Sequence, residues 1–408
     1  MSKKSPQLRF EGFTDDWEER KLSDVANHRG GTAIEKYFDK DGEYKVISIG
    51  SYGLNSQYVD QNIRAISNEI TDGRVVNSGE LTMVLNDKTA NGTIIGRTLL
   101  VEKDNEYVIN QRTEIISPKE NFDSNFAYTI LNGPFREKVK RIVQGGTQIY
   151  VNYPAVSNLN LELPKIEEQQ KIGSFFKQLD DTIALHQRKL DLLKEQKKGF
   201  LQKMFPKNGA KVPELRFAGF ADDWEERKLS SGLREYTDRV IVEDDKEYYQ
   251  ISVRNNFGGI TLRGSKMGNK IGRKRQAKIN LTKYPQTLIF TRQTVEQGGI
   301  GWVDKYCDGA IVTENMPTIS LDTSVFSKYF LTNLFQTRIF YKNAILDNVE
   351  GGSAQIAIHE SKFLSSTLLF PNLDEQEKIG QFFKQLDNTI TLHQRKLDLL
   401  KEQKKGFL

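Results

Sequence analysis

The chain has 408 residues and a formal net charge of +5, with 59 Lys and Arg against 54 Asp and Glu. This length exceeds one small domain, and 37% hydrophobic with 10% aromatic residues excludes a mainly disordered chain. No apolar run approaches the roughly 20 residues of a membrane span, and the charged start lacks the apolar stretch of a secretory signal. We therefore expect a cytoplasmic protein with several packed domains and no membrane partner.

Cysteine and histidine usage argues against a structural metal. Cys307 is the sole cysteine, which removes disulfides and multi-cysteine zinc sites, and the four histidines lack ligand spacing. We interpret Cys307 as a packing residue rather than a reactive thiol, because nothing around it favours a thiolate. No metal site is predicted.

The chain repeats itself with an offset of 207 residues. A lead-in segment, residues 8–23, returns as residues 215–230 with 14 of 16 positions identical, and a tail segment, 170–201, returns as 377–408 with 28 of 32 identical. The two middles between these ends have diverged almost completely. Matched ends favour two copies of one partner docking on equivalent surfaces, and diverged middles favour two different targets. The alternative is that gene conversion has kept the two pairs of ends alike.

The lead-in, residues 1–25, is predicted to form a short helix. Thr14 or Asp15 is a plausible N-cap, and Trp17 and Leu22 are apolar anchors. The second lead-in, residues 215–232, repeats this pattern around Trp224. We interpret both tryptophans as packing residues, with partner contact as the alternative.

The first middle, residues 26–164, is predicted to be a mixed α/β domain. Strands are expected at residues 44–49, 81–85, 93–101 and 107–116, and helix over 124–143 with a break near Gly133. Its loops carry side chains able to read base edges, because Arg suits guanine and Asn or Gln suits adenine. The candidate DNA-binding residues here are Asn86, Lys88, Asn91, Arg97, Arg112, Gln144, Thr147 and Gln148.

The first tail, residues 165–205, is predicted to be one long helix with a coiled-coil seam. Apolar positions follow one another at steps of four and three, which is a 3.5-residue period. The second tail, residues 372–408, repeats the pattern. The seam comprises Ile172, Phe176, Leu179, Ile183, His186, Leu190 and Leu193, then Ile379, Phe383, Leu386, Ile390, His393, Leu397 and Leu400. The two histidines are interpreted as polar residues that set the register rather than as ligands.

Two such helices are expected to pair with each other. An isologous contact between repeated units would set them antiparallel, and a parallel pair is the alternative. A turn-prone linker, residues 206–214, separates the first tail from the second lead-in.

The second middle, residues 233–371, is also predicted to be mixed α/β, with strands at 248–253, 287–291 and 310–321 and helix over 324–346. Residues 263–278 hold seven basic residues and no acidic one, and glycines predict a loop. Such a loop suits phosphate contacts, since neutralised phosphates release counterions; a solvated surface loop is the alternative. The candidate DNA-binding residues here are Arg263, Lys266, Lys270, Arg273, Lys274, Arg275, Lys278, Arg292, Gln293, Gln297 and Gln355.

Catalytic motifs are missing from the sequence. There is no P-loop, no Asn/Asp-Pro-Pro-aromatic motif of amino-methyltransferases, and no supported nuclease or nucleotide-cofactor motif. We predict that the chain binds without catalysing, with no catalytic residues and no cofactor of its own.

The layout resembles the DNA specificity subunits of type I restriction-modification systems. The resemblance rests on Trp-x4-Leu lead-ins, on Gly-Gly-Thr and Gly-Gly-Ser segments before the tails, and on tails of the form Glu-Gln-x-Lys-Ile-Gly-x-Phe-Phe-x-x-Leu-Asp-x-x-Ile. It spans nearly the whole chain. One departure is that the chain stops at Leu408, whereas the first tail continues through 202–205, which leaves the length of the second helix open.

The resemblance implies two target recognition domains, the two middles, separated and bridged by two long antiparallel coiled-coil helices in a pseudo-twofold repeat. Each domain would read one half of a bipartite, asymmetric site in double-stranded DNA, and the helices would set the spacing. It also implies two modification subunits that use S-adenosylmethionine to methylate adenine, and restriction subunits that use ATP and Mg. The alternatives are a stand-alone two-domain DNA-binding regulator and an interaction scaffold that does not bind DNA.

Overall fold

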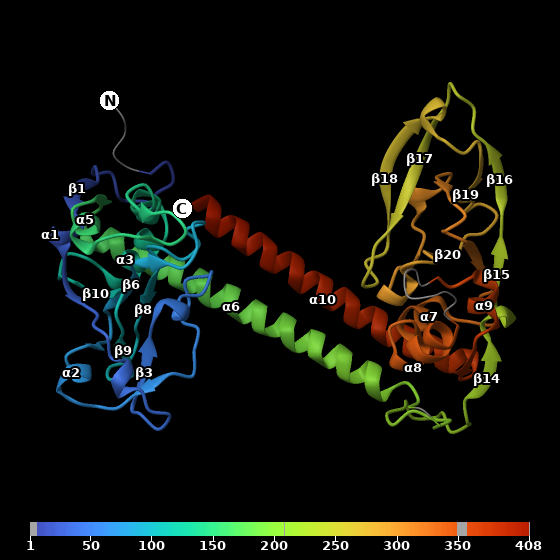
Figure 1. The fold of residues 1–408 in the computed structure, drawn as a ribbon, viewed down its shortest axis with the longest axis horizontal. Helices are drawn as coiled ribbons and strands as arrows, with labels where there is room; N and C mark the ends of the chain where they lie inside the picture. The colour runs from blue at the N-terminus through green and yellow to red at the C-terminus, as the bar shows by residue number, and fades with distance from the viewer. Residues whose placement is uncertain (1–5, 208, 349–356, 408) are drawn as a thin grey trace. The chain divides into compact units, whose positions relative to one another are not determined.

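The computed structural model describes residues 6–207, 209–348 and 357–407. The chain divides into two compact units, unit 1 with residues 1–187 and 396–408 and unit 2 with residues 188–395 (Figure 1). Each unit combines one lead-in, one middle and parts of both tails. The repeat seen in the sequence is therefore a repeat of folded units.

The lead-ins are strands, so the prediction of lead-in helices is wrong for their central residues. Strand β1 (Glu18–Lys21) pairs antiparallel with β13 (Asn160–Leu163), and among the described lead-in residues 6–25 only the four of α1 (Leu22–Val25) are helical. In unit 2, β14 (Glu225–Lys228) pairs in the same way with β24 (Thr367–Phe370), and a 3-10 turn follows. Backbone pairing with the strand that precedes each tail outweighs the local helix signals.

Unit 1 is built around an antiparallel four-stranded sheet in the order β2-β10-β6-β8. Its strands are β2 (Ala26–Gly30), β10 (Thr113–Pro118), β6 (Leu81–Val84) and β8 (Thr98–Leu100). Helices α3 (Ser124–Asn132) and α4 (Pro134–Lys140) pack on it and share its apolar core. The predicted break near Gly133 is confirmed, whereas the predicted strand over 107–116 is two strands joined by a tight turn.

Smaller elements complete unit 1. A second sheet has the order β4-β3-β9-β5, and a third has the order β11-β12-β7. These strands are β4 (Arg64–Ala65), β3 (Tyr44–Ile47), β9 (Tyr107–Ile109), β5 (Val75–Val76), β11 (Gln144–Gly145), β12 (Ile149–Tyr150) and β7 (Asn86–Asp87). The short helices are α2 (Glu69–Asp72) and α5 (Tyr153–Ser157).

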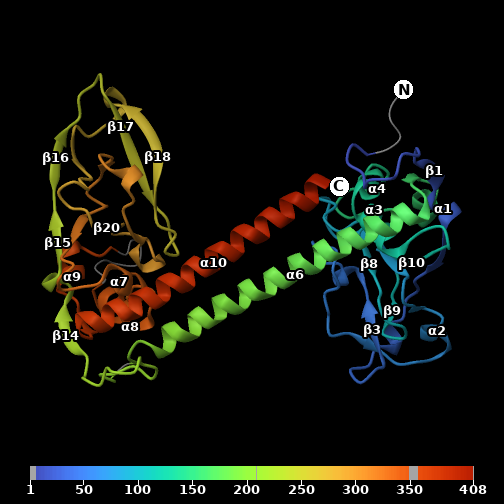
Figure 2. The same ribbon diagram turned by 180° about the vertical axis from the view of Figure 1, so that it is seen from behind.

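Unit 2 has a matching four-stranded sheet in the order β15-β23-β20-β21. Its strands are β15 (Leu233–Tyr236), β23 (Thr318–Leu321), β20 (Thr287–Phe290) and β21 (Ile300–Trp302). The helices are α7 (Lys328–Leu334), α8 (Arg338–Phe340) and α9 (Glu360–Ser365). Figure 2 shows α7 and α8 gathered beside the start of the second tail helix.

Unit 2 also has a five-stranded sheet in the order β16-β19-β22-β17-β18, and the described residues of unit 1 form no equally large counterpart. Its strands are β16 (Asp238–Ile241), β19 (Arg275–Lys278), β22 (Ile311–Val312), β17 (Glu247–Val253) and β18 (Ile260–Met267). The divergence of the two middles is thus concentrated in the strands beyond a shared four-stranded sheet.

The tails are the long helices α6 (Ile166–Lys203) and α10 (Leu373–Phe407). In unit 1, Lys404 Nζ lies 2.6 Å from Asp180 Oδ1. In unit 2, Lys197 Nζ lies 2.7 Å from Asp387 Oδ1, which is the same pair shifted by 207 residues. Each unit therefore packs the end of one tail against the first half of the other in antiparallel orientation, as predicted.

The seam positions in both helices are buried or half-buried. Four leucines outside the seam are exposed instead, and they occupy related positions in the two tails. Their exposed fractions are 63% for Leu185, 52% for Leu192, 66% for Leu392 and 59% for Leu399. The 3.5-residue period thus separates a buried stripe from an exposed apolar one.

Candidate DNA interface

Each unit has one cleft at the same place in its four-stranded sheet. Cleft 1 has a volume of about 980 Å³ and cleft 2 about 840 Å³. Cleft 1 lies beside the pairing of Gly30 with Glu114, where β2 ends and β10 begins, and cleft 2 lies beside the pairing of Tyr236 with Thr318, where β15 ends and β23 begins. The two clefts are topological counterparts.

At each cleft, the segment after β6 or after its counterpart β20 is held by a backbone hydrogen bond to the segment before the next strand of the sheet. The backbone nitrogen of Leu85 donates to the carbonyl oxygen of Arg112 over 3.0 Å in cleft 1. In cleft 2, the nitrogen of Arg292 donates to the carbonyl oxygen of Asn315, also over 3.0 Å. The clefts share this position on the four-stranded sheet, but strands of another sheet line cleft 2 and residues 151–155 line cleft 1, so both their walls and their side chains differ.

Cleft 2 is lined by four arginines. Arg273 pairs with Glu314 at 2.8 Å, and the Arg292 guanidinium donates to Glu360. Within the part of the chain that the structure describes, no carboxylate forms an ion pair with Arg239 or Arg275. They lie on the adjacent strands β16 and β19, where Ile241 pairs with Arg275. Both side chains are exposed, and they stand diagonally on one face of the sheet, able to meet a phosphate together.

Arg239 is a cleft residue that sequence reasoning missed. It stands alone between Asp238 and Val240, outside any basic run. The signal that identifies it is the alternation of β16, in which Arg239 and Ile241 are exposed while their neighbours are half-buried. That alternation has meaning only once β16 is known to pair with β19.

The basic segment 263–278 is not a loop, so that prediction is wrong. Arg263 and Lys266 lie on β18, Lys270 ends a 3-10 turn, and Arg275 and Lys278 lie on β19. Antiparallel pairing of β18 with β17 outweighs the glycine signal, with Gly264 placed at a bulge with φ of +133°.

Part of the positive charge in this segment is already balanced. Lys274 pairs with Asp244, and Lys278 lies 3.9 Å from Asp238. Both acidic residues come from the segment around β16, outside the acid-free run. Of the seven basic residues, Arg273 and Arg275 line cleft 2.

Cleft 1 is lined by polar groups rather than by a cluster of arginines. Asn86 and Arg112 line it together with Gln111 and Asn152. Arg112 adopts a φ of +67°, which is uncommon for a residue with a β-carbon. Its exposed side chain is thus presented from a tight turn at the start of β10.

A hairpin next to cleft 1 carries three more of the predicted DNA-binding residues. Strand β12 pairs with both β11 and β7, so that Tyr150 lies opposite Gln144 and Asn86. Thr147 and Gln148 are exposed at the tip. The structure therefore brings Gln144, Thr147 and Gln148 close to Asn86 although they are far apart in the sequence.

Asp87 orders the loop that holds Lys88 and Asn91. Its carboxylate accepts hydrogen bonds from the nitrogens of Thr89 (2.9 Å) and Ile94 (2.8 Å). Burial alone would raise the pKa of Asp87, but these hydrogen bonds outweigh it and hold the pKa below its ordinary value. Lys88 and Asn91 are exposed on a loop with a defined conformation.

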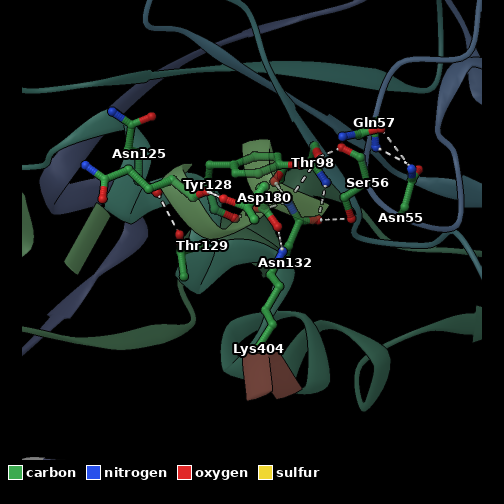
Figure 3. A network of polar contacts seen from close by, with 12 residues as sticks. Asn55, Ser56, Gln57, Thr98, Asn125, Tyr128, Thr129, Asn132, Asp180 and Lys404 are labelled. Atoms are coloured by element: carbon green, nitrogen blue, oxygen red, sulfur yellow. Dashed lines mark hydrogen bonds and ion pairs between the residues drawn. The ribbon is translucent and has the colours of Figure 1, made fainter. Parts of the chain in front are cut away.

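Arg97 is engaged inside unit 1 and does not line cleft 1. Its guanidinium donates to the carbonyl oxygen of Thr93 and to Ser56 Oγ, each over 2.9 Å. Ser56 in turn donates to Asn132 and accepts from the Tyr128 hydroxyl through its carbonyl oxygen (Figure 3). Burial lowers the pKa of Arg97. Its DNA contact stays a prediction without geometric support.

Two predicted DNA-binding residues of unit 2, Gln293 and Gln297, do not line cleft 2. Gln293 is exposed beside Arg292, and Gln297 accepts a hydrogen bond from Asn255 over 2.6 Å. Gln355 lies outside the described residues. Cys307 is buried in an apolar cluster, and burial raises the pKa of its thiol.

Metal-ligand clusters and membrane-spanning helices are both missing from the part of the chain that the structure describes. No group of three or more His, Cys, Asp and Glu residues is placed there to hold a metal ion. None of its helices is long and apolar enough to cross a membrane.

Two mixed α/β units, each with a cleft on a shared sheet and each packed on tail helices, define a tandem recognition protein. The family model for the type I restriction modification DNA specificity domain matches residues 14–195 and 222–402. The chain therefore belongs to the family of type I restriction-modification specificity subunits, and it carries two recognition domains.

Similar proteins cover part or nearly all of the chain. The MjaVIII specificity subunit of Methanocaldococcus jannaschii is 22% identical, over 97% of this chain and 91% of that protein. The HindI specificity subunit of Haemophilus influenzae is 27% identical over 42% of this chain and 37% of that protein. The crystal structure of an S subunit from M. genitalium has a TM-score of 0.63 at 12% identity, covering 99% of this chain and 97% of that one. That likeness shows a shared fold.

Proposed function

We propose that cleft 1 and cleft 2 each read one half of a bipartite, asymmetric site in double-stranded DNA. The observation that carries this proposal is that the clefts have the same position in the fold and different linings. Equivalent positions on the shared four-stranded sheet would bring two half-sites to corresponding places, and different linings would select different bases.

The linings suit different tasks in DNA binding. Arg239 and Arg275 in cleft 2 offer unbalanced positive charge to phosphates or to guanine edges. Asn86 and Asn152 in cleft 1 offer amides of the kind that bond adenine in pairs. Partner subunits would then act on a flipped adenine, since chemistry on a base requires it outside the stack.

The tail helices would set the distance between the half-sites. Helix α6 has 38 residues and would be about 57 Å long at 1.5 Å per residue. Half-sites read from one side of a duplex lie about 34 Å apart for one helical turn. A helix of this length is long enough to serve as such a spacer.

Two modification subunits would dock on the matched parts of the chain. Leu185 and Leu192 are exposed one heptad apart on α6, and Leu392 and Leu399 repeat them on α10. Repetition of the same exposed leucines in both tails would give two copies of one partner equivalent apolar contacts. Those partners would bring S-adenosylmethionine, and restriction subunits would bring ATP- and Mg-dependent DNA cleavage.

The experiment maps methyladenine in DNA modified by the chain in complex with its modification subunits. An Arg239→Ala, Arg275→Ala double variant should lose or relax one half of the methylated motif and leave the other half unchanged. Lys305→Ala, an exposed basic residue outside cleft 2, is the matched control and should leave the motif intact.

Two outcomes would contradict the proposal. An unchanged motif in the cleft 2 variant would show that cleft 2 does not read DNA. Tight sequence-specific binding by the isolated chain, with no dependence on modification subunits, would favour a stand-alone regulator instead.

A further inference from the structure

One arginine of cleft 2, Arg292, is held at both its backbone and its side chain. Its backbone nitrogen donates to the carbonyl oxygen of Asn315, and its own carbonyl oxygen accepts from the nitrogen of Ile358, each over 3.0 Å. Its Nε and Nη2 atoms both donate to Glu360 Oε2, over 2.9 and 2.5 Å. The guanidinium therefore has a defined orientation before any ligand binds.

The contact with Glu360 leaves one edge of the Arg292 guanidinium available. Nε and Nη2 form the edge that meets the carboxylate, and Nη1 and Nη2 form the outer edge. Among the described residues, none accepts a hydrogen bond from Nη1. The side chain is partly exposed and lines cleft 2. The outer edge can therefore donate two hydrogen bonds to a planar acceptor in the cleft.

The charge around Arg292 suits a base edge better than a phosphate. Arg292 and Glu360 form an ion pair with side chains 20% and 17% exposed, and the pair is neutral as a whole. Glu235 lines the same cleft from β15, which lies beside α9 (Figure 1). Burial and the charge of Glu360 raise the pKa of Glu235, against the opposing effect of Arg292. A phosphate requires surplus positive charge, whereas a base edge requires only oriented donors.

Cleft 1 has different side chains at the equivalent positions. The 207-residue offset places Leu85 where cleft 2 has Arg292, and Tyr153 where cleft 2 has Glu360. The backbone bonding is the same, because the carbonyl oxygen of Leu85 accepts from the nitrogen of Val151 over 2.9 Å. The position that carries a guanidinium in cleft 2 thus carries an apolar side chain in cleft 1. At this point of the fold the two half-sites would be read differently.

We propose that Arg292 is a specificity-determining residue that reads a guanine in the half-site of cleft 2, and that Glu360 is the positioning residue that orients it. This inference rests on the proposed function of cleft 2 and names the base that one of its residues selects. The outer guanidinium edge donates to guanine O6 and N7. Guanine is the one base that presents two adjacent acceptors in the major groove.

The test compares the same substitution at two arginines of cleft 2, in the complex with modification subunits. Lysine keeps the positive charge but loses the planar, two-pronged donor edge. Arg292→Lys should relax one G·C position of the methylated motif, and discrimination there should fall by about 5- to 150-fold. Arg275→Lys is the matched control and should leave the motif intact, because lysine still binds a phosphate.

Methyladenine mapping identifies the relaxed position, and the affinity of the complex for duplexes varied at that position measures the discrimination. The other positions of the same half-site should persist in Arg292→Lys, which would show that unit 2 remains folded. Relaxation by Arg275→Lys in place of Arg292→Lys would assign the guanine to Arg275 and overturn the proposal.

Glu360→Gln tests the positioning role, because glutamine keeps an acceptor oxygen and loses the charge. Discrimination at the same G·C position should fall, but by less than in Arg292→Lys. The double variant should discriminate no worse than Arg292→Lys alone, since Glu360 acts only through Arg292. An intact motif in Glu360→Gln, or a further loss in the double variant, would overturn that role.

Two outcomes would overturn the guanine assignment. One is an unchanged motif from Arg292→Lys, and the other is relaxation at an A·T position. The Arg239→Ala, Arg275→Ala double variant separates this failure from failure of the proposed function. If that variant also leaves the motif unchanged, cleft 2 does not read DNA; if it alters the motif while Arg292→Lys does not, only the guanine assignment fails.

Discussion

Gly173 of α6 lies so close to Phe126 of α3 that a β-carbon at position 173 would be 2.6 Å from the Phe126 backbone nitrogen. Gly380 stands in the same relation to Phe330, at 2.8 Å. Real β-carbons do not approach backbone atoms this closely, so only glycine permits the contact. Each recognition domain is thus held against its tail helix by direct backbone packing.

Gly173→Ala should therefore destabilise unit 1, by about 2 kcal/mol, because either the helix or the domain must move. Gly199→Ala is the matched control on the same helix, since nothing lies within 4 Å of the added methyl group. It should be neutral or stabilising by up to about 1 kcal/mol through helix propensity. Urea denaturation of both variants measures these changes. Equal effects would show that the contact at Gly173 is not tight.

The salt dependence of DNA affinity should distinguish a basic residue without a carboxylate partner, Arg275, from one that is already paired, Lys274. Arg275→Ala should lower the slope of log K against log salt by about 0.9 if one phosphate contact is lost. Lys274→Ala should change the slope much less, because Lys274 already pairs with Asp244 and donates to the carbonyl oxygen of Gly268. The measurement is DNA affinity of the complex at several salt concentrations. An unaltered slope for Arg275→Ala would place cleft 2 away from the phosphates.

Stability should depend on pH through Asp87. Its folded-state pKa is lowered, so its carboxylate contributes stability above its unfolded pKa of about 3.9, and this is lost as the pH falls through the lower folded value. Asp87→Asn should cost about 1–3 kcal/mol at pH 7, with the deficit shrinking in acid. Asp41→Asn, at an exposed turn, should change little. A deficit that stays constant from pH 7 to pH 3 would contradict this assignment.

The repeat and the seam could be predicted from the sequence because both are local regularities. Positions such as Leu190 and Leu397 follow a fixed spacing, and both are buried as that spacing requires. Pairing of like units then predicts antiparallel helices, and the ion pairs of Lys197 and Lys404 confirm them.

The lead-in strands and the basic segment could not be predicted because distant residues determine them. Glu18–Lys21 becomes a strand only because it pairs with Asn160–Leu163. The charge of Lys274 is balanced by Asp244, which lies outside the acid-free run. Arg239 joins cleft 2 through strand pairing that no local pattern shows.

Lengthening both tail helices should change the spacing of the DNA site but not its half-sites. Four residues inserted after Gln187 and four after Gln394, which are related positions, add about 6 Å of helix. The permitted spacer should grow by about two base pairs, at 3.4 Å each. The methylated motif of the complex reports both features. Altered half-sites with an unchanged spacer would contradict the spacer role.

The most direct test of the account is to give both units the same recognition domain. Residues 24–159 are replaced by residues 231–366, a segment of equal length that begins and ends at related positions of the repeat. Methyladenine mapping with the modification subunits present should then reveal a bipartite motif with two identical half-sites in inverted orientation. An unchanged asymmetric motif from an assembled complex would contradict the claim that each cleft reads its own half-site.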